Sequence, residues 1–180
     1  MRGVMLKGKN MVDRESYEVF KAIIKGEVEK LDAYVNQGFD IKARTEKEKW
    51  TRLHMATRAI RKPINLDSLK YLINSGIDLN AQDMYGNTAL HYAAAKKDPE
   101  AIKILLEAGS EVDIENRDGI TPLHQSLLKN PKSLEATEAL LIAGANPDRN
   151  LRTEGRTIRG LVEIIAHGEN EFLKSLFDRY

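Results

Sequence analysis

Two stretches of the chain, YGNTALHYAA at 85–94 and DGITPLHQSL at 118–127, match each other at a spacing of 33 residues. The matching pairs are Gly86 and Gly119, Thr88 and Thr121, Leu90 and Leu123, and His91 and His124. An upstream stretch, KWTRLHMAT at 49–57, has a related set 37 residues before the first: Thr51, Leu53 and His54. Self-similarity at such a period is typical of a repeat protein, in which each repeat is one supersecondary unit.

A second motif follows each copy of the first. It occurs as LKYLINSGIDLNAQD at 69–83, IKILLEAGSEVDIEN at 102–116 and EALLIAGANPDRN at 138–150, with an earlier copy, LDAYVNQGFDIKAR, at 31–44. Each copy holds one glycine, at spacings of 38, 33 and 35 residues: Gly38, Gly76, Gly109 and Gly144. The chain therefore consists of a 33-residue unit with insertions, which we place at 58–67 and 129–137.

The unit at residues 83–115 predicts two helices. Thr88 can cap the first, and Asp98 can cap the second, whose first turn holds Pro99, where the missing N–H has no effect. Apolar residues at helical spacing form the buried face of the second helix: Ile102, Leu105 and Leu106. Gly109 supplies the left-handed residue that ends it. One unit cannot bury both helices, so stability comes from stacking on neighbouring units.

The two motifs together resemble the ankyrin repeat family, whose repeats open with T-P-L-H-x-A-A and close their second half with G-A-D-V-N. Three copies here carry both halves in register. The resemblance implies an all-α fold, a solenoid of stacked helix–turn–helix units joined by extended loops or hairpins. We place units at 14–44, 45–82, 83–115, 116–150 and 151–180, after a flexible tail at 1–13. The first unit lacks the threonine–histidine opening and the last lacks the leucine–histidine pair, so both are interpreted as divergent caps.

The resemblance also implies a structural role for three of the four histidines. In ankyrin repeats the histidine of T-P-L-H hydrogen-bonds to the backbone and to the nearby threonine, and so ties the loop to the helix. The corresponding pairs here are Thr51 with His54, Thr88 with His91, and Thr121 with His124. A catalytic histidine would not normally recur at a structural period. We therefore interpret these histidines as part of the scaffold.

The chain shows no sequence motif of an enzyme. It has no cysteine, which excludes disulfides, thiolate nucleophiles and zinc held by cysteine. It has neither a G-x-x-x-x-G-K phosphate loop nor a G-x-S-x-G elbow. Neighbouring acids such as Asp113 and Glu115, or Glu169 and Glu171, are more often solvated or capping groups than acid–base pairs. We expect no enzyme activity, no cofactor and no metal site.

Function is then expected on the surface of the stack, and the partner is expected to be another protein. In the ankyrin family the binding face is a slightly concave surface of loop tips and first helices. Carried over position by position, it comprises Lys47, Trp50, Arg58, Met84, Tyr85, Asn87, Lys96, Arg117, Asp118 and Ile120. Trp50, the only tryptophan, and Tyr85 are favoured as anchors, because aromatic residues are enriched among interface hot spots. The alternative for Trp50 is that it folds back over the inserted loop and serves packing only.

Charge is uneven along the chain, although 28 Lys and Arg nearly balance 27 Asp and Glu. The basic zone Lys42–Lys62 holds only two acidic residues, Glu46 and Glu48. It holds eight cationic residues: Lys42, Arg44, Lys47, Lys49, Arg52, Arg58, Arg61 and Lys62. We interpret this zone either as a solvated surface or as a means of steering an acidic partner. Nucleic-acid or acidic-ligand binding through it is the alternative function, although only Trp50 is available there to stack on bases.

No segment approaches the length of a membrane span, and the N-terminus has no apolar run typical of a secretory signal. We therefore expect a cytoplasmic protein, and a monomer, as ankyrin stacks commonly are. Small ankyrin proteins occur among bacterial immunity or antitoxin-like proteins, which block a toxin, and among effectors that are exported to engage host proteins. The sequence leaves these roles open.

Overall fold

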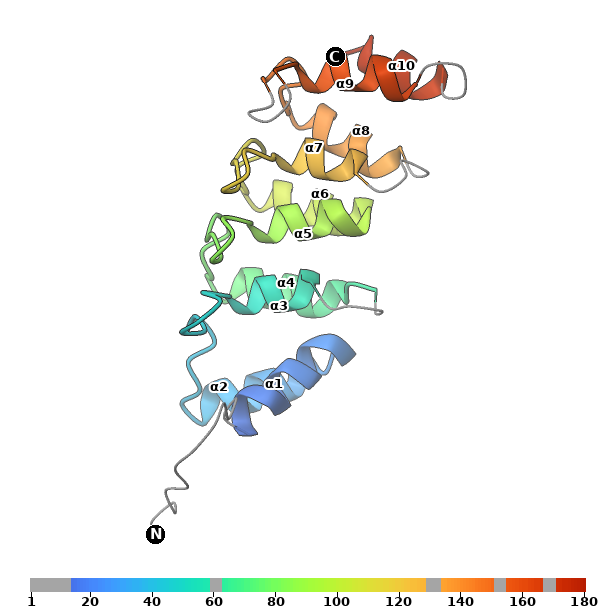
Figure 1. Ribbon diagram of the computed structural model, residues 1–180. Coiled ribbons are helices and arrows are strands. Elements are labelled where there is room, and N and C mark those ends of the chain that lie inside the picture. The colour runs from blue at the N-terminus through green and yellow to red at the C-terminus, as the bar shows by residue number, and fades with distance from the viewer. Residues whose placement is uncertain (1–13, 59–62, 129–133, 151–154, 167–170) are drawn as a thin grey trace.

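The computed structural model describes residues 14–58, 63–128, 134–150, 155–166 and 171–180. In these residues the chain forms ten helices, which follow one another in five pairs (Figure 1). Their bounds are α1 Arg14–Lys25, α2 Val28–Asn36, α3 Arg52–Arg58, α4 Leu66–Asn74, α5 Ala89–Lys96, α6 Pro99–Glu107, α7 Pro122–Leu127, α8 Glu135–Ile142, α9 Ile158–Ile165 and α10 Glu171–Phe177. This is the all-α repeat fold that the sequence predicts.

The pairs stack along one axis from α1 and α2 to α9 and α10 (Figure 1). The first helices α1, α3, α5 and α7 contact one another in that order, and the second helices α2, α4, α6 and α8 form a parallel row behind them. A single apolar core runs between the rows and includes Leu31, Leu53, Leu72, Leu90, Leu105, Leu123, Leu140 and Leu176. Because each pair buries its apolar face only against its neighbours, the core is continuous through the stack.

Side-chain caps begin several of the helices. Thr88 forms a reciprocal capping box with His91 at the start of α5. Asp98 precedes α6, where its carboxylate accepts a hydrogen bond from the Ala101 N–H and Pro99 occupies the first turn. The predicted caps at Thr88 and Asp98 are therefore confirmed. Asn65 caps α4 in the same way, by accepting from the N–H of Ser68.

Left-handed glycines follow the second helices of the first four pairs. Their φ angles are positive in every case: Gly38 at 96°, Gly76 at 72°, Gly109 at 101° and Gly144 at 86°. A residue with a Cβ is strained in this region, whereas glycine is not. The prediction that Gly109 ends its helix is confirmed.

The connections between pairs are loops that contain tight turns, and no strand occurs among the described residues. In the turn before α5, the N–H of Asp83 donates to the carbonyl of Asn87 at 2.9 Å. Successive turns are also joined, since the N–H of Arg117 donates to the carbonyl of Tyr85 at 3.0 Å. The turns form a row along one side of the stack, the left side in Figure 1.

Some of the sequence-based predictions concern residues outside the described ranges. These are the tail at 1–13, part of each insertion at 58–67 and 129–137, and His167. Each unit that we placed contains one helix pair, while its limits remain predictions. None of the helices in the described ranges has the length and apolar character that crossing a membrane requires.

Candidate protein-binding face

Two of the repeated histidines, His91 and His54, link adjacent pairs of helices. The Nδ1 atom of His91 accepts from the N–H of Thr88 at 3.1 Å, and its Nε2 lies 2.9 Å from the carbonyl oxygen of Ile120. Since a carbonyl only accepts, Nε2 carries the proton. Burial lowers the pKa of His91 to about 4, so the ring is neutral at pH 7. These are the hydrogen bonds that the family resemblance implies.

His54 repeats this arrangement, and His124 shares its helix position. The Nδ1 of His54 accepts from the N–H of Thr51 at 3.1 Å, and its Nε2 lies 2.9 Å from the carbonyl oxygen of Asn87. His124 occupies the third position of α7, and its N–H donates to Oγ1 of Thr121 at 3.3 Å. Ile120 follows His91 by 29 residues. The residue at the same distance after His124 lies outside the described ranges.

Four side chains gather where the turn before α3 meets α5, and we call them the Trp50 cluster: Trp50, Arg58, Asp83 and Tyr92. Asp83 is buried, and its Oδ2 accepts from Nε1 of Trp50 at 3.2 Å and from the Tyr92 hydroxyl at 2.6 Å. The guanidinium carbon of Arg58 lies 4.5 Å from the centroid of the Trp50 ring and 5.8 Å from that of Tyr92. The four residues thus form one polar and aromatic contact network on the first-helix side.

Burial and the bond to Asp83 raise the pKa of Tyr92 to about 12. The tyrosine therefore stays protonated at neutral pH and remains a donor to Asp83. The other oxygen of Asp83 accepts from the N–H groups of Tyr85 and Asn87, both at 2.9 Å. One buried carboxylate therefore fixes the turn tip as well as the two aromatic rings.

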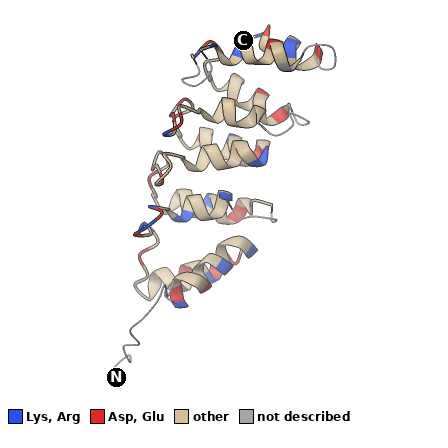
Figure 2. Cartoon of the chain, viewed as in Figure 1, with Lys and Arg blue, Asp and Glu red and all other residues tan. Residues whose placement is uncertain are grey.

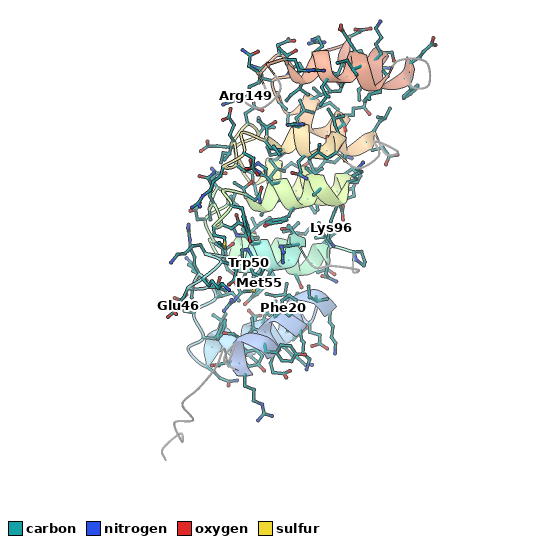
Figure 3. The ribbon with its side chains drawn as sticks, viewed as in Figure 1. Phe20, Glu46, Trp50, Met55, Lys96 and Arg149 are labelled. Atoms are coloured by element: carbon teal, nitrogen blue, oxygen red, sulfur yellow. The ribbon has the colours of Figure 1, made fainter. Side chains whose placement is uncertain are left out.

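The predicted partner-binding residues fall into two groups. Trp50 and Arg58 meet in the Trp50 cluster, where Trp50 is half-buried and hydrogen-bonded. The others are spread along the row of turns and the end of α5: Lys47, Met84, Tyr85, Asn87, Lys96, Arg117, Asp118 and Ile120. Among these, Tyr85 projects at the turn tip with 53% of its surface exposed, and Lys47, Arg117 and Asp118 are also exposed. Figure 3 shows Trp50 beside α3 and Lys96 at the end of α5.

The basic zone Lys42–Lys62 is less basic at the surface than its sequence suggests. Arg52 is only 4% exposed, with its guanidinium carbon 5.0 Å from the centroid of the Phe39 ring. Burial lowers the pKa of this arginine. Arg44 forms an ion pair with Asp78 at 3.0 Å, and Arg61 and Lys62 lie outside the described ranges. Treating Arg52 as part of a surface zone was therefore wrong. Figure 2 shows cationic residues at the turn before α3 and acidic ones at the later turns.

Sequence reasoning missed Asp83 and Tyr92. A signal for Tyr92 was present, because it is the fourth residue after a capping threonine. The same position after each threonine is half-buried in four successive units, where it holds Met55, Tyr92, Gln125 and Leu161. The residue type at this partly exposed position differs from unit to unit. Asp83 gave no comparable signal, because turns of this kind often contain aspartate.

The described residues contain no group of three or more His, Cys, Asp or Glu side chains arranged to hold a metal ion. In the Trp50 cluster, the one carboxylate is occupied by four hydrogen bonds. What this arrangement offers is a rigid surface with an aromatic and cationic centre.

Comparison with known proteins identifies ankyrin repeats in this chain. A family model described as ankyrin repeats (3 copies) matches residues 13–116 and 58–151. The ankyrin repeat protein FPV233 of fowlpox virus is 46% identical over 76 residues, which are 41% of this chain and 14% of that protein. The tyrosine-protein kinase Shark of Drosophila melanogaster is 39% identical over 82 residues, or 45% of this chain and 8% of the kinase.

A longer match is to ankyrin repeat and SOCS box protein 6 of Pongo abelii. It is 28% identical over 147 residues, which are 70% of this chain and 34% of that protein. In each of these three comparisons the matched region spans about a third or less of the relative's own length.

Proposed function

The chain belongs to the ankyrin repeat family, and from this membership we propose that it is a non-catalytic module that binds another protein. Ankyrin repeats generally mediate protein–protein interaction, and the family is generally not catalytic. The kinase relative matches this chain over only 8% of its own length, so its activity gives no reason to propose an enzyme here.

The proposed binding face is the row of turn tips together with the partly exposed side of α3 and α5. One observation carries this choice: the exposed ring of Tyr85 projects from a turn that Asp83 holds rigid. A large apolar side chain on a fixed backbone loses little conformational freedom on binding, which favours affinity. On or beside the same turns and α3 lie further members of the face: Trp50, Arg58, Lys47, Met84 and Asn87. The face is extended by Lys96, Arg117, Asp118 and Ile120.

Binding of nucleic acid through the basic zone is the weaker alternative. The zone loses Arg52 to the interior, and Arg44 is paired with Asp78. The face of Trp50 that Arg58 covers is also closed to a base. An immunity protein and an exported effector are narrower forms of the proposed function, and they differ in the partner that is bound.

The test is affinity capture from a lysate of the source cell, with the bound proteins identified by mass spectrometry. We expect the wild type to retain one protein. Tyr85→Ala, which removes a candidate hot spot, should weaken the binding of that protein at least about tenfold. The matched control is Ile142→Ala, because Ile142 is 67% exposed but lies on the second helix α8. Equal loss in both variants, or none in Tyr85→Ala, would reject this face.

Two further measurements accompany the capture. Recovery of nucleic acid at low salt, equally by all variants, would favour the alternative, because phosphate contacts weaken steeply as salt increases. Light scattering of the purified protein tests the proposal that it is a monomer, for which a mass of 20.3 kDa is expected.

A further inference from the structure

We propose that Arg58, held against the rings of Trp50 and Tyr92, is the docking point for a carboxylate side chain in an acidic segment of the partner. This inference rests on the proposed function and specifies the chemistry of its binding face. Three observations carry it: the fixed position of the Arg58 guanidinium, its lack of a carboxylate partner in the described chain, and its cover of one face of Trp50.

The guanidinium is positioned before any partner arrives. Arg58 is the last residue of α3, and its side chain runs back along the helix to reach Trp50, which precedes the helix. Distances of 4.5 Å to the Trp50 centroid and 5.8 Å to the Tyr92 centroid lie within the range of cation–π contacts. An arginine stacked in this way loses less side-chain freedom on binding than one that extends into solvent.

The aromatic rings are themselves fixed by Asp83. Its Oδ2 accepts from the Trp50 indole N–H and from the Tyr92 hydroxyl, and the carboxylate is only 4% exposed. Asp83 accepts four hydrogen bonds in all, two from N–H groups of its own turn and two from the rings, so both carboxylate oxygens have partners. The buried carboxylate of Asp83 therefore positions the two rings, and the rings in turn position the Arg58 guanidinium at the surface.

Arg58 differs from the arginines of the stack that already pair with a carboxylate. Arg44 pairs with Asp78 at 3.0 Å, Arg149 with Glu115 at 2.7 Å and Arg159 with Asp148 at 2.7 Å. No carboxylate oxygen of the described ranges lies within 4.0 Å of the Arg58 guanidinium. Arg58 is also half-exposed, so its N–H donors can reach an external acceptor. A planar guanidinium forms two parallel hydrogen bonds to a carboxylate, which is the strongest pairing open to it.

The surroundings favour an acidic peptide segment over a nucleic acid. Lys47 and Lys49 are exposed in the turn that leads to Trp50, but Glu46 and Glu48 of the same turn offset their charge, so the cation that the site offers is Arg58 itself. Nucleic-acid binding would require free aromatic faces on which bases stack. Here Arg58 occupies a face of Trp50, the only tryptophan of the chain. The same contact makes the site an anion receptor with an intrinsic fluorescent reporter.

The experiment is a titration of Trp50 fluorescence with a hexaglutamate peptide at low salt, with hexalysine and a dT12 oligonucleotide as comparison probes. We expect a saturable change with hexaglutamate and none with hexalysine. Arg58→Gln should weaken the binding by about tenfold or more, because it removes hydrogen bonds to a charged acceptor. Arg58→Lys should recover little of it, since lysine keeps the charge but not the planar fork. The matched control Lys103→Gln, an exposed cation on the second helix α6, should bind like the wild type.

Three outcomes would overturn the inference. The first is the absence of a saturable change up to about 1 mM peptide. The second is full recovery by Arg58→Lys, which would indicate general electrostatic attraction. The third is tighter binding of dT12 than of hexaglutamate. Circular dichroism of each variant verifies that it is folded. Failure here, with capture of a partner through Tyr85 intact, would reject the carboxylate site and leave the proposed function standing.

Discussion

The Nε2 atom of His91 lies 2.9 Å from the carbonyl oxygen of Ile120, 29 residues further along the chain. The hydrogen bond joins the start of α5 to the turn that leads into α7, so it belongs to the contact between two units. The same ring accepts the N–H of Thr88 through Nδ1. A single neutral imidazole therefore caps its own helix and ties that helix to the next unit.

Stability should fall as the pH decreases below about 6.5. His91 has its pKa lowered from 6.5 to about 4 by burial, and burial also lowers the pKa of His54. Between these two values the unfolded chain binds more protons than the folded one, so acid favours unfolding. For His91 alone we expect a loss of about 2 kcal/mol in the free energy of unfolding between pH 7.5 and pH 5. Urea unfolding at the two pH values measures it.

The control for this prediction is His91→Gln, which has no titrating ring. It should be less stable than the wild type at pH 7.5 by about 1–3 kcal/mol, because buried hydrogen-bonding groups lose their partner. Its dependence on pH should be weaker than that of the wild type. An unchanged pH dependence would show that His91 does not titrate in the unfolding reaction.

Gly86→Ala should destabilise the stack more than Gly109→Ala. Both glycines have positive φ, 80° and 101°, so either alanine is strained by about 1–2 kcal/mol. A Cβ on Gly86 would also lie 2.7 Å from the backbone N of Arg117, whereas a Cβ on Gly109 meets nothing within 4 Å. Since backbone cannot move aside as a side chain can, we expect an additional loss for Gly86→Ala. Equal urea midpoints and slopes for the two variants would contradict this explanation.

The sequence predicted the fold through its period. Thr88, Asp98 and Gly109 have local roles as a cap, a cap and a left-handed residue, and such roles are set by residue type and spacing. Stacking then follows, because each unit leaves an apolar face that only a neighbour can cover. For these reasons a single sequence was sufficient to predict an all-α solenoid.

The binding face could be predicted only in outline. Position within the repeat indicated Trp50 and Arg58, but not that the two would be in contact, nor that Asp83 and Tyr92 would fix them. The contacts of Trp50 with Asp83 and of Arg58 with Tyr92 join residues from different units, so the arrangement depends on how the units stack. Arg52 shows the converse error, because local charge suggested a surface residue whereas stacking against Phe39 buries it.

Arg52→Met should leave the protein as stable as the wild type or more stable, by up to about 1 kcal/mol. Methionine retains much of the buried stem, and it removes a cation whose Nε has no hydrogen-bond partner among the described residues. Arg52→Ala, by contrast, should destabilise through the space that it leaves. Urea unfolding of both variants compares the effect of removing the buried cation with the effect of removing the packing of its side chain. A clear loss in Arg52→Met would mean that the contacts with Phe39 and Met55 outweigh desolvation of the charge.

Arg159→Lys should loosen the last helix pair without affecting the centre of the stack. Nε and Nη2 of Arg159 donate to the two oxygens of Asp148 at 2.7 and 3.1 Å, and Nη1 donates to the carbonyl of Phe177 at the end of α10. A lysine ammonium cannot reproduce the two-pronged contact and also reach Phe177. We expect hydrogen exchange in residues 171–180 to accelerate by about tenfold, while α5 and α6 keep their protection.

The matched control is Arg179→Lys in the same pair. Arg179 lies 3.8 Å from Glu138 and is 57% exposed, so the change of side chain should alter exchange very little. The comparison separates the geometry of the Arg159 contacts from the chemistry of an Arg-to-Lys exchange. Equal hydrogen exchange of α10 in both variants would mean that the attachment of this helix does not depend on Arg159. It would depend instead on the apolar contacts of Leu173, Leu176 and Phe177, which are all buried.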